Sequence, residues 1–177
     1  MRKLKMQELG RMTVEEFQAA SKSDIRLVLD NVRSAHNVGA AFRTADAFRV
    51  EHLLLGGICA TPPHKDITKT ALGASDSVNW TRAEKLVPTL KEWKKDGWKI
   101  IAVEQTDGST ALKDFSFDNC EKVALIFGHE VKGVSDEVLE ICDEAVVIEQ
   151  FGTKHSLNIS VSVGIVLWQF MRGLSRS

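Results

Sequence analysis

The sequence is poor in the features that mark secreted, membrane-bound and metal-binding proteins. It has only three cysteines, at wide and irregular spacings, which excludes a disulfide framework and a zinc knuckle. No apolar run reaches the roughly 18 residues of a membrane span, and the start turns polar before a signal core can form. The five histidines show no paired metal-ligand spacing. We expect a cytoplasmic protein with reduced thiols, no membrane contact and no metal.

Net charge and proline are also scarce. Lys and Arg number 23 against 24 Asp and Glu, for a net charge of −1, which argues against non-specific coating of a nucleic acid but allows a local basic patch. The three prolines include the pair in 61–65, where we expect an ordered surface loop. The sequence shows no repeat and no linker, and a domain of this size buries about 70% of its unfolded surface. A single domain is therefore expected.

Short apolar runs alternate with helical stretches along most of the chain. Several runs are continuously apolar, as strands covered on both faces are. The predicted strands are 25–29, 52–55, 77–80, 98–103, 123–127 and 145–148, and the predicted helices are 38–48, 86–96 and 136–142. This alternation predicts an α/β fold, a parallel sheet flanked by helices on both sides.

The two ends of the chain depart from this alternation. Residues 1–22 predict a short N-terminal helical arm, because Thr13 and Glu16 are spaced as a capping box, and the α/β domain is expected over 23–177. Residues 157–171 alternate like a strand, but the apolar run is too long for one, and it predicts a helix. Because that helix is apolar nearly all round, we expect it to be buried, in part by a second subunit.

Common nucleotide-binding and hydrolase motifs are missing. No G-x-G-x-x-G follows a strand, which argues against a nicotinamide-dependent oxidoreductase. The sequence 152–156 lacks the leading glycine and the Gly-Lys pair of a P-loop, and no G-x-S-x-G elbow is present.

Three other segments place polar residues after predicted strands. In the first, 30–48, Asn37 stands at the expected N-cap of a helix, and Gly39, Arg43 and Asp46 share the face opposite its apolar stripe. A solvated Arg43–Asp46 pair is the more common explanation of such a face. Taken alone, the segment does not identify a site.

The other two segments are also ambiguous when taken singly. Residues 124–135 form a buried strand that ends in a loop with Gly128 and Glu130, where a ligand can approach the backbone of an α/β sheet. Residues 146–160 form a strand and a glycine loop, followed by Ser156 and Asn158. A plain turn explains the former, and helix capping the latter.

Taken together and in this order, the segments read N-x-G-x-x-x-R, F-G-x-E-x-x-G and G-x-x-x-S-L-N. This combination resembles the signature motifs of the SpoU, or TrmH-like, family of the SPOUT RNA methyltransferase superfamily, and the resemblance extends from residue 25 to about residue 170. It implies a parallel-sheet domain whose C-terminal segment forms a deep trefoil knot. It also implies a homodimer that binds S-adenosylmethionine in the knot and methylates a ribose 2′-hydroxyl of tRNA or rRNA.

The resemblance also assigns roles to residues. The positions that match the family's catalytic centre are Asn37, Arg43, Glu130, Ser156 and Asn158, and those that match its cofactor site are Glu104, Gly128, Ile148, Gly152 and Leu157. Because an arginine stays protonated, Arg43 is expected to stabilise the developing oxyanion or a nearby phosphate rather than to act as a base. The third motif departs from the family, which usually has proline and methionine where this chain has Glu149 and Gln150.

The RNA and the reaction class are less closely defined. Many rRNA-directed relatives carry a separate RNA-binding domain, so the short arm favours tRNA. Basic residues of the arm and predicted loops that would contact phosphates are Arg2, Lys3, Lys5, Arg11, Arg33, Lys65, Lys69, Lys132 and Lys154. The altered third motif leaves a catalytically silent RNA-binding protein of the same fold as an alternative, and a base-directed RNA methyltransferase is another.

Overall fold

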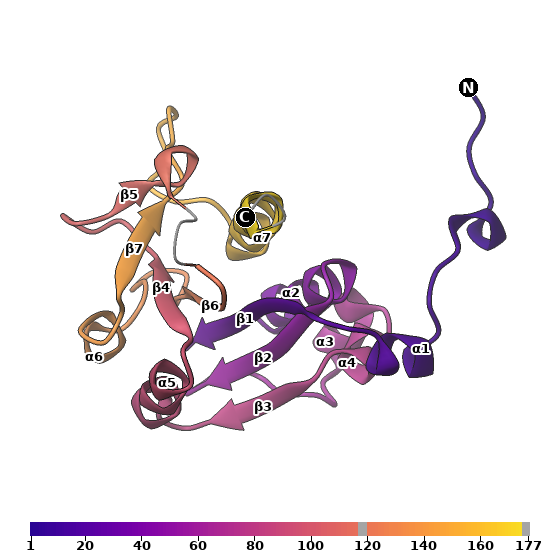
Figure 1. The fold of residues 1–177 in the computed structure, drawn as a ribbon, viewed down its shortest axis with the longest axis horizontal. Helices are drawn as coiled ribbons and strands as arrows, with labels where there is room; N and C mark the ends of the chain where they lie inside the picture. Colours follow the sequence, from indigo (N-terminus) through magenta and orange to yellow (C-terminus); the bar gives the residue numbers. More distant parts are fainter. Residues whose placement is uncertain (117–119, 175–177) are drawn as a thin grey trace.

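A computed structural model describes residues 1–116 and 120–174 (Figure 1). Residues 175–177, which end the predicted 23–177 domain, and residues 117–119 lie outside the described part of the chain. The elements in chain order are η1 (Met6–Leu9), α1 (Val14–Ala19), β1 (Ser23–Asp30), α2 (Ala35–Ala47), β2 (Val50–Gly56), α3 (Lys65–Ala71), α4 (Ala74–Ser77), β3 (Trp80–Ala83), α5 (Leu86–Lys95), β4 (Lys99–Val103), β5 (Thr110–Ala111), η2 (Leu112–Asp114), β6 (Val123–Phe127), α6 (Asp136–Leu139), β7 (Glu144–Val147) and α7 (Ile159–Leu174).

Seven strands of the described chain form one sheet in the order β3-β2-β1-β6-β4-β7-β5, and their pairings are parallel. Leu27 of β1 lies opposite Leu53 of β2 on one side and Leu125 of β6 on the other. The carboxyl ends of parallel strands meet at one edge of a sheet. The loops after β1, β4, β6 and β7 therefore converge there.

Alternate residues of the strands feed two separate cores. Leu27 and Leu125 belong to the larger core, which packs under α2, α3 and α7, whereas Val28 and Ile126 belong to a second core under α5 and α6. This period of two shows that helices cover both faces of the sheet. The predicted α/β fold with helices on both sides is confirmed.

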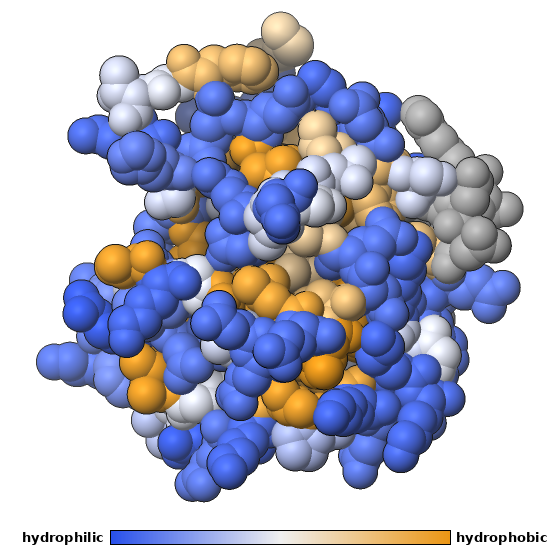
Figure 2. Space-filling model, turned by 90° about the vertical axis from the view of Figure 1, so that its left-hand side faces the viewer, coloured by the Kyte–Doolittle hydropathy of each residue, from blue (hydrophilic) through white to orange (hydrophobic). Residues whose placement is uncertain are grey.

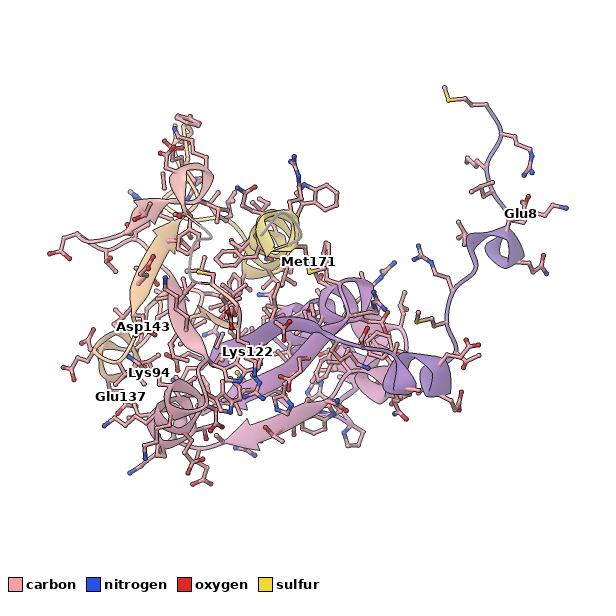
Figure 3. The ribbon with its side chains drawn as sticks, viewed as in Figure 1. Glu8, Lys94, Lys122, Glu137, Asp143 and Met171 are labelled. Carbon is pink, nitrogen blue, oxygen red and sulfur yellow. The ribbon has the colours of Figure 1, made fainter. Side chains whose placement is uncertain are left out.

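An ion pair joins α5, which covers the second core, to the start of β7. Lys94 of α5 lies beside Asp143, which precedes β7 (Figure 3), with 2.8 Å between the ammonium nitrogen and the carboxylate oxygen. The other carboxylate oxygen of Asp143 accepts the backbone N–H of Ile100 in β4 at 2.8 Å. The outer surface on this side is mainly hydrophilic, with smaller hydrophobic patches between the polar residues (Figure 2).

The N-terminal arm contains the expected capping box. The Thr13 hydroxyl accepts the N–H of Glu16, and the Glu16 carboxylate accepts the N–H of Thr13 at 2.8 Å. Phe17 of α1 is buried in the larger core, whereas η1 stands away from the body of the protein (Figure 1). Glu8 marks that detached position in Figure 3.

Most predicted elements are present, and the main differences lie between residues 65 and 80 and at the start of α2. Predicted strand 77–80 is wrong, because α4 ends at Ser77, whose buried hydroxyl bonds Asp46, and the strand begins only at Trp80. The region 65–77 holds α3 and α4, which the sequence pattern did not reveal. The run 157–171 is helical, as predicted, from Ile159.

The start of α2 also differs from the prediction. Asn37 is not the N-cap, because the Ser34 hydroxyl accepts the N–H of Asn37 and the helix already begins at Ala35. Gly39 is buried rather than placed on an open face, and a Cβ there would lie 2.7 Å from the carbonyl oxygen of Ile67 and closer still to Thr70 Oγ1. Glycine thus lets α3 cross directly over α2.

Candidate active site

A pocket of about 500 Å³ lies at the carboxyl edge of the sheet, beyond the ends of β4, β6 and β7 and beside the start of α7. Residues 103–105, 127–131, 133, 146–148, 150, 155–159 and 162 line it. Apolar strand ends therefore form its floor, and loops with glycine, carboxylate and amide groups form its rim. Its volume and mixed lining are typical of small-molecule sites.

Glu130, in the loop after β6, joins this pocket to the first turn of α2. Its carboxylate accepts the backbone N–H groups of Arg33 and Ser34, both at 3.0 Å, and the side-chain amide of Asn37 at 3.1 Å. Partial burial raises the pKa of Glu130, but these hydrogen bonds and one from its own N–H together lower it below its ordinary value of 4.5. The carboxylate is therefore ionised, and both of its oxygens accept hydrogen bonds from the start of α2 and the residues just before it.

Glu104, at the end of β4, fixes the other side of the same loop. One carboxylate oxygen accepts the N–H of Val134 at 3.0 Å, and the other accepts the N–H of Gln105 at 2.8 Å. Gly128 and Gly133 approach each other so closely that a Cβ on Gly128 would strike the backbone of Gly133. Gly133 also adopts a φ of 72°, which favours glycine. Both glycines are thus needed for the loop to close on itself.

Asp30 is a buried carboxylate that the sequence analysis did not single out. It is 2% exposed, accepts the N–H of Ser135 at 2.7 Å and accepts the side-chain amide of Asn31 at 2.8 Å. It ties the end of β1 to the end of the loop that carries Glu130. The segment 30–48 contained it, but a single aspartate at a strand end gives no signal that a residue 105 positions away is its partner.

The third motif provides the wall of the pocket next to α7. The side-chain oxygen of Asn158 accepts the N–H of Ser160 at 2.8 Å and its hydroxyl at 2.6 Å, so Asn158 caps the helix. Ser156 and Leu157 line the pocket from the exposed loop before it. Asn158 therefore caps α7, as the capping explanation predicts, and it also lines the pocket.

The structure gathers most of the predicted site residues. Seven of the ten line the pocket, namely Glu104, Gly128, Glu130, Ile148, Ser156, Leu157 and Asn158. Asn37 reaches the pocket through Glu130. Gly152 and Arg43 are not among the lining residues.

Arg43 is an exposed residue of α2, and its neighbours Phe42 and Ala45 are buried in the core. It follows Asn37 by six residues, which corresponds to about 9 Å along a helix axis. Its guanidinium makes no hydrogen bond or ion pair within 1–116 and 120–174. Arg43 is therefore available to a ligand that extends from the pocket over α2.

The three cysteines are not among the residues that line this pocket. Cys59 is buried beneath the end of β1, and burial raises the pKa of its thiol to about 11. It accepts the N–H of Val32 and donates to the carbonyl of Leu29, as a structural thiol does. In the part of the chain that the structure describes, no three His, Cys, Asp or Glu side chains gather as metal ligands, and no helix is long and apolar enough to cross a membrane.

Comparisons with known proteins show which family the chain resembles. Residues 24–168 match the SpoU rRNA Methylase family. The chain is 34% identical over 152 residues to the 23S rRNA (guanosine-2′-O-)-methyltransferase RlmB of Neisseria meningitidis, covering 86% of this chain and 60% of the relative. It is 32% identical over 165 residues to the tRNA (guanosine(18)-2′-O)-methyltransferase of Aquifex aeolicus, covering 90% of this chain and 74% of the relative.

A solved structure extends the match to three dimensions. The AdoMet-bound rRNA methyltransferase of Sinorhizobium meliloti superimposes with a TM-score of 0.78 at 25% identity, covering 87% of this chain and 58% of that one. The chain spans about half to three fifths of the length of the first curated relatives it matches. Because the family match covers residues 24–168, most of its length, the chain belongs to the SpoU rRNA Methylase family.

Proposed function

We propose that this chain is an S-adenosylmethionine-dependent RNA ribose 2′-O-methyltransferase that acts on tRNA in preference to rRNA. The observation that carries the proposal is the meeting of the second and third motifs on one pocket of about 500 Å³, with the first motif bonded to it through Glu130. The tRNA preference is supported by the Aquifex relative, of which the match covers a larger share than of the rRNA enzyme from Neisseria.

The pocket residues fit S-adenosylmethionine. Val103, Phe127, Ile148 and Leu157 offer apolar surface to an adenine ring, and the exposed polar groups of the pocket loops suit the cofactor's charged amino-acid end. Relatives of comparable fold include an AdoMet-bound enzyme. When bound, this cofactor supplies a methyl group on an electrophilic sulfonium. The protein must then bring an oxygen nucleophile into line with that methyl group.

Arg43 is the residue that we assign to the ribose. A permanently charged guanidinium lowers the energy of an alkoxide or of the adjoining phosphate through charge-assisted hydrogen bonds, and a phosphate oxygen or water takes the proton. Glu130 and Asn37 hold the first turn of the helix that carries Arg43. Replacement by lysine preserves the charge but loses the planar fork, so we expect Arg43→Lys to lose most of its turnover.

Exposed cations support RNA as the partner. Arg33 follows β1 at the carboxyl edge of the sheet, and Lys65 and Lys69 belong to α3, which packs against α2. Lys132 and Lys154 lie on the two pocket loops. Each of these side chains is exposed and makes no ion pair with a residue of the described ranges. They can therefore bind phosphates without first breaking an ion pair with a protein carboxylate.

We further propose a homodimer, a cytoplasmic location and the trefoil knot of the C-terminal segment. Val161, Ile165 and Trp168 form a stripe on α7 at helical spacing and are 39% to 58% exposed. Such a stripe is typical of a surface that a second copy covers. The knot is what the family resemblance implies for the C-terminal segment.

Methyl transfer tests the proposal directly. Labelled S-adenosylmethionine is incubated with total tRNA and, separately, with rRNA from cells that lack this gene. We expect transfer to tRNA by the unaltered chain and none by Arg43→Ala, with the cofactor affinity of the variant unchanged. A failure of the unaltered chain to bind the cofactor would contradict the proposal.

A further inference from the structure

The pocket wall formed by residues 155–158 is a loop with little burial of its own. Residues 151–158 are all exposed, and the sequence from 146 to 160 contains no proline to restrict it. An exposed loop of this kind loses conformational entropy when it closes on a ligand, which weakens binding. Contacts that hold the wall in place beforehand therefore contribute directly to affinity.

Side chains from two other segments anchor this loop. The side-chain amide of Gln105 donates to the carbonyl oxygen of His155 at 2.7 Å, and that of Gln150 donates to the same oxygen at 3.4 Å. The ammonium of Lys113 lies 2.7 Å from the carboxylate of Glu149. Because that ion pair is exposed, solvent screens it, and it contributes little.

Of these side chains, Gln105 is the one whose own backbone is held by a hydrogen bond at the end of β4. Its own N–H donates to the Glu104 carboxylate at 2.8 Å, and the other oxygen of that carboxylate accepts the N–H of Val134. Gln105 therefore extends from a fixed point at the end of β4 to the one carbonyl that both amides share. His155 stands next to Ser156, so the contact fixes the wall immediately before the Ser-Leu-Asn sequence.

We propose that Gln105 is a positioning residue that holds the pocket wall 155–158 against the end of β4 through the carbonyl of His155. This rests on the proposed function, because the ligand that gains from the ordered wall is S-adenosylmethionine. Its loss raises the Kd and KM for the cofactor and leaves kcat at saturating cofactor unchanged.

Three substitutions separate the hydrogen bond from mere packing. Gln105→Ala removes the donor, Gln105→Glu keeps the shape but can only accept, and Gln105→Lys restores a donor of similar reach. For Ala and Glu we expect cofactor binding, measured by isothermal titration calorimetry, to weaken about 3- to 10-fold. Gln105→Lys should recover most of the affinity, and the melting temperature of all three should stay close to that of the unaltered chain.

Gln18 offers a matched control. Its side-chain amide donates to the carbonyl of Asp76 at 3.2 Å, between α1 and α4 and outside the pocket lining. We expect Gln18→Ala to leave cofactor affinity unchanged.

Two results would overturn the positioning role: unchanged affinity in both Gln105→Ala and Gln105→Glu, or a fall in kcat at saturating cofactor with no change in KM. An absence of cofactor binding by the unaltered chain is a different outcome, which overturns the proposed function itself.

Discussion

The crossing of α3 over α2 depends on Gly39, and its replacement by alanine tests that packing. Alanine gains about 1 kcal/mol over glycine inside a helix, so on propensity alone the variant would be more stable. The new methyl group, however, would lie 2.7 Å from the carbonyl oxygen of Ile67, a backbone atom that cannot rotate away. Overpacking costs roughly 1–3 kcal/mol, and a contact this short with a backbone atom belongs to the upper part of that range, about 2–3 kcal/mol. After the helix-propensity gain is subtracted, we expect a net loss of about 1–2 kcal/mol.

Thermal unfolding followed by circular dichroism measures this loss. For a chain of this length, 1 kcal/mol corresponds to a shift in Tm of roughly 2–4 °C, so Gly39→Ala should melt about 2–8 °C lower. Thr70→Ala removes the side-chain atom nearest the new methyl group, and in that background the cost of Gly39→Ala should be smaller. A Tm equal to or above that of the unaltered chain, or full additivity of the two changes, would refute the packing argument.

Two further predictions concern the site and its RNA. Because the pKa of Glu130 is lower in the folded chain than its ordinary value of 4.5, its ionised form stabilises the fold above that pH, and the contribution is lost as the pH falls through the folded pKa. The difference in unfolding free energy between the unaltered chain and Glu130→Gln should therefore shrink as urea titrations move from neutral pH to below 4.5; a constant difference would contradict this. Replacing Lys65 and Lys69 together by glutamine should weaken RNA binding and reduce its salt dependence by about two ions. Lys91→Gln on α5, on the other face of the sheet, should change neither. Equal effects of the two replacements would exclude the α3 cations from the RNA surface.

The parallel sheet could be predicted because its signal is local. Runs such as 123–127 are apolar on both faces, and only strands covered by helices on both sides need that composition. The two helices in 65–77 could not be predicted from the sequence, because α3 and α4 are short and owe their stability to contacts with α2. Ser77 is an example, since its hydroxyl bonds Asp46 on α2 rather than taking part in a strand.

In the candidate site, too, some residues could be predicted from the sequence and others could not. Glu130, Ser156 and Asn158 could be found because motif spacing is visible along the chain. Asp30 and Gln105 could not, since the partners that give them a role lie 105 and 50 residues away. Helical spacing did place Arg43 on the face opposite the apolar stripe of its helix, and Arg43 is exposed in the structure.

The most direct test of the account is to locate the transferred methyl group. After reaction of tRNA with labelled S-adenosylmethionine, nuclease digestion and nucleoside mass spectrometry distinguish a ribose-methylated nucleoside from a base-methylated one. The account predicts a 2′-O-methylated nucleoside that is formed by the unaltered chain and is absent with Arg43→Ala, although that variant still binds the cofactor. A methyl group on a base, or unchanged transfer by Arg43→Ala, would contradict it.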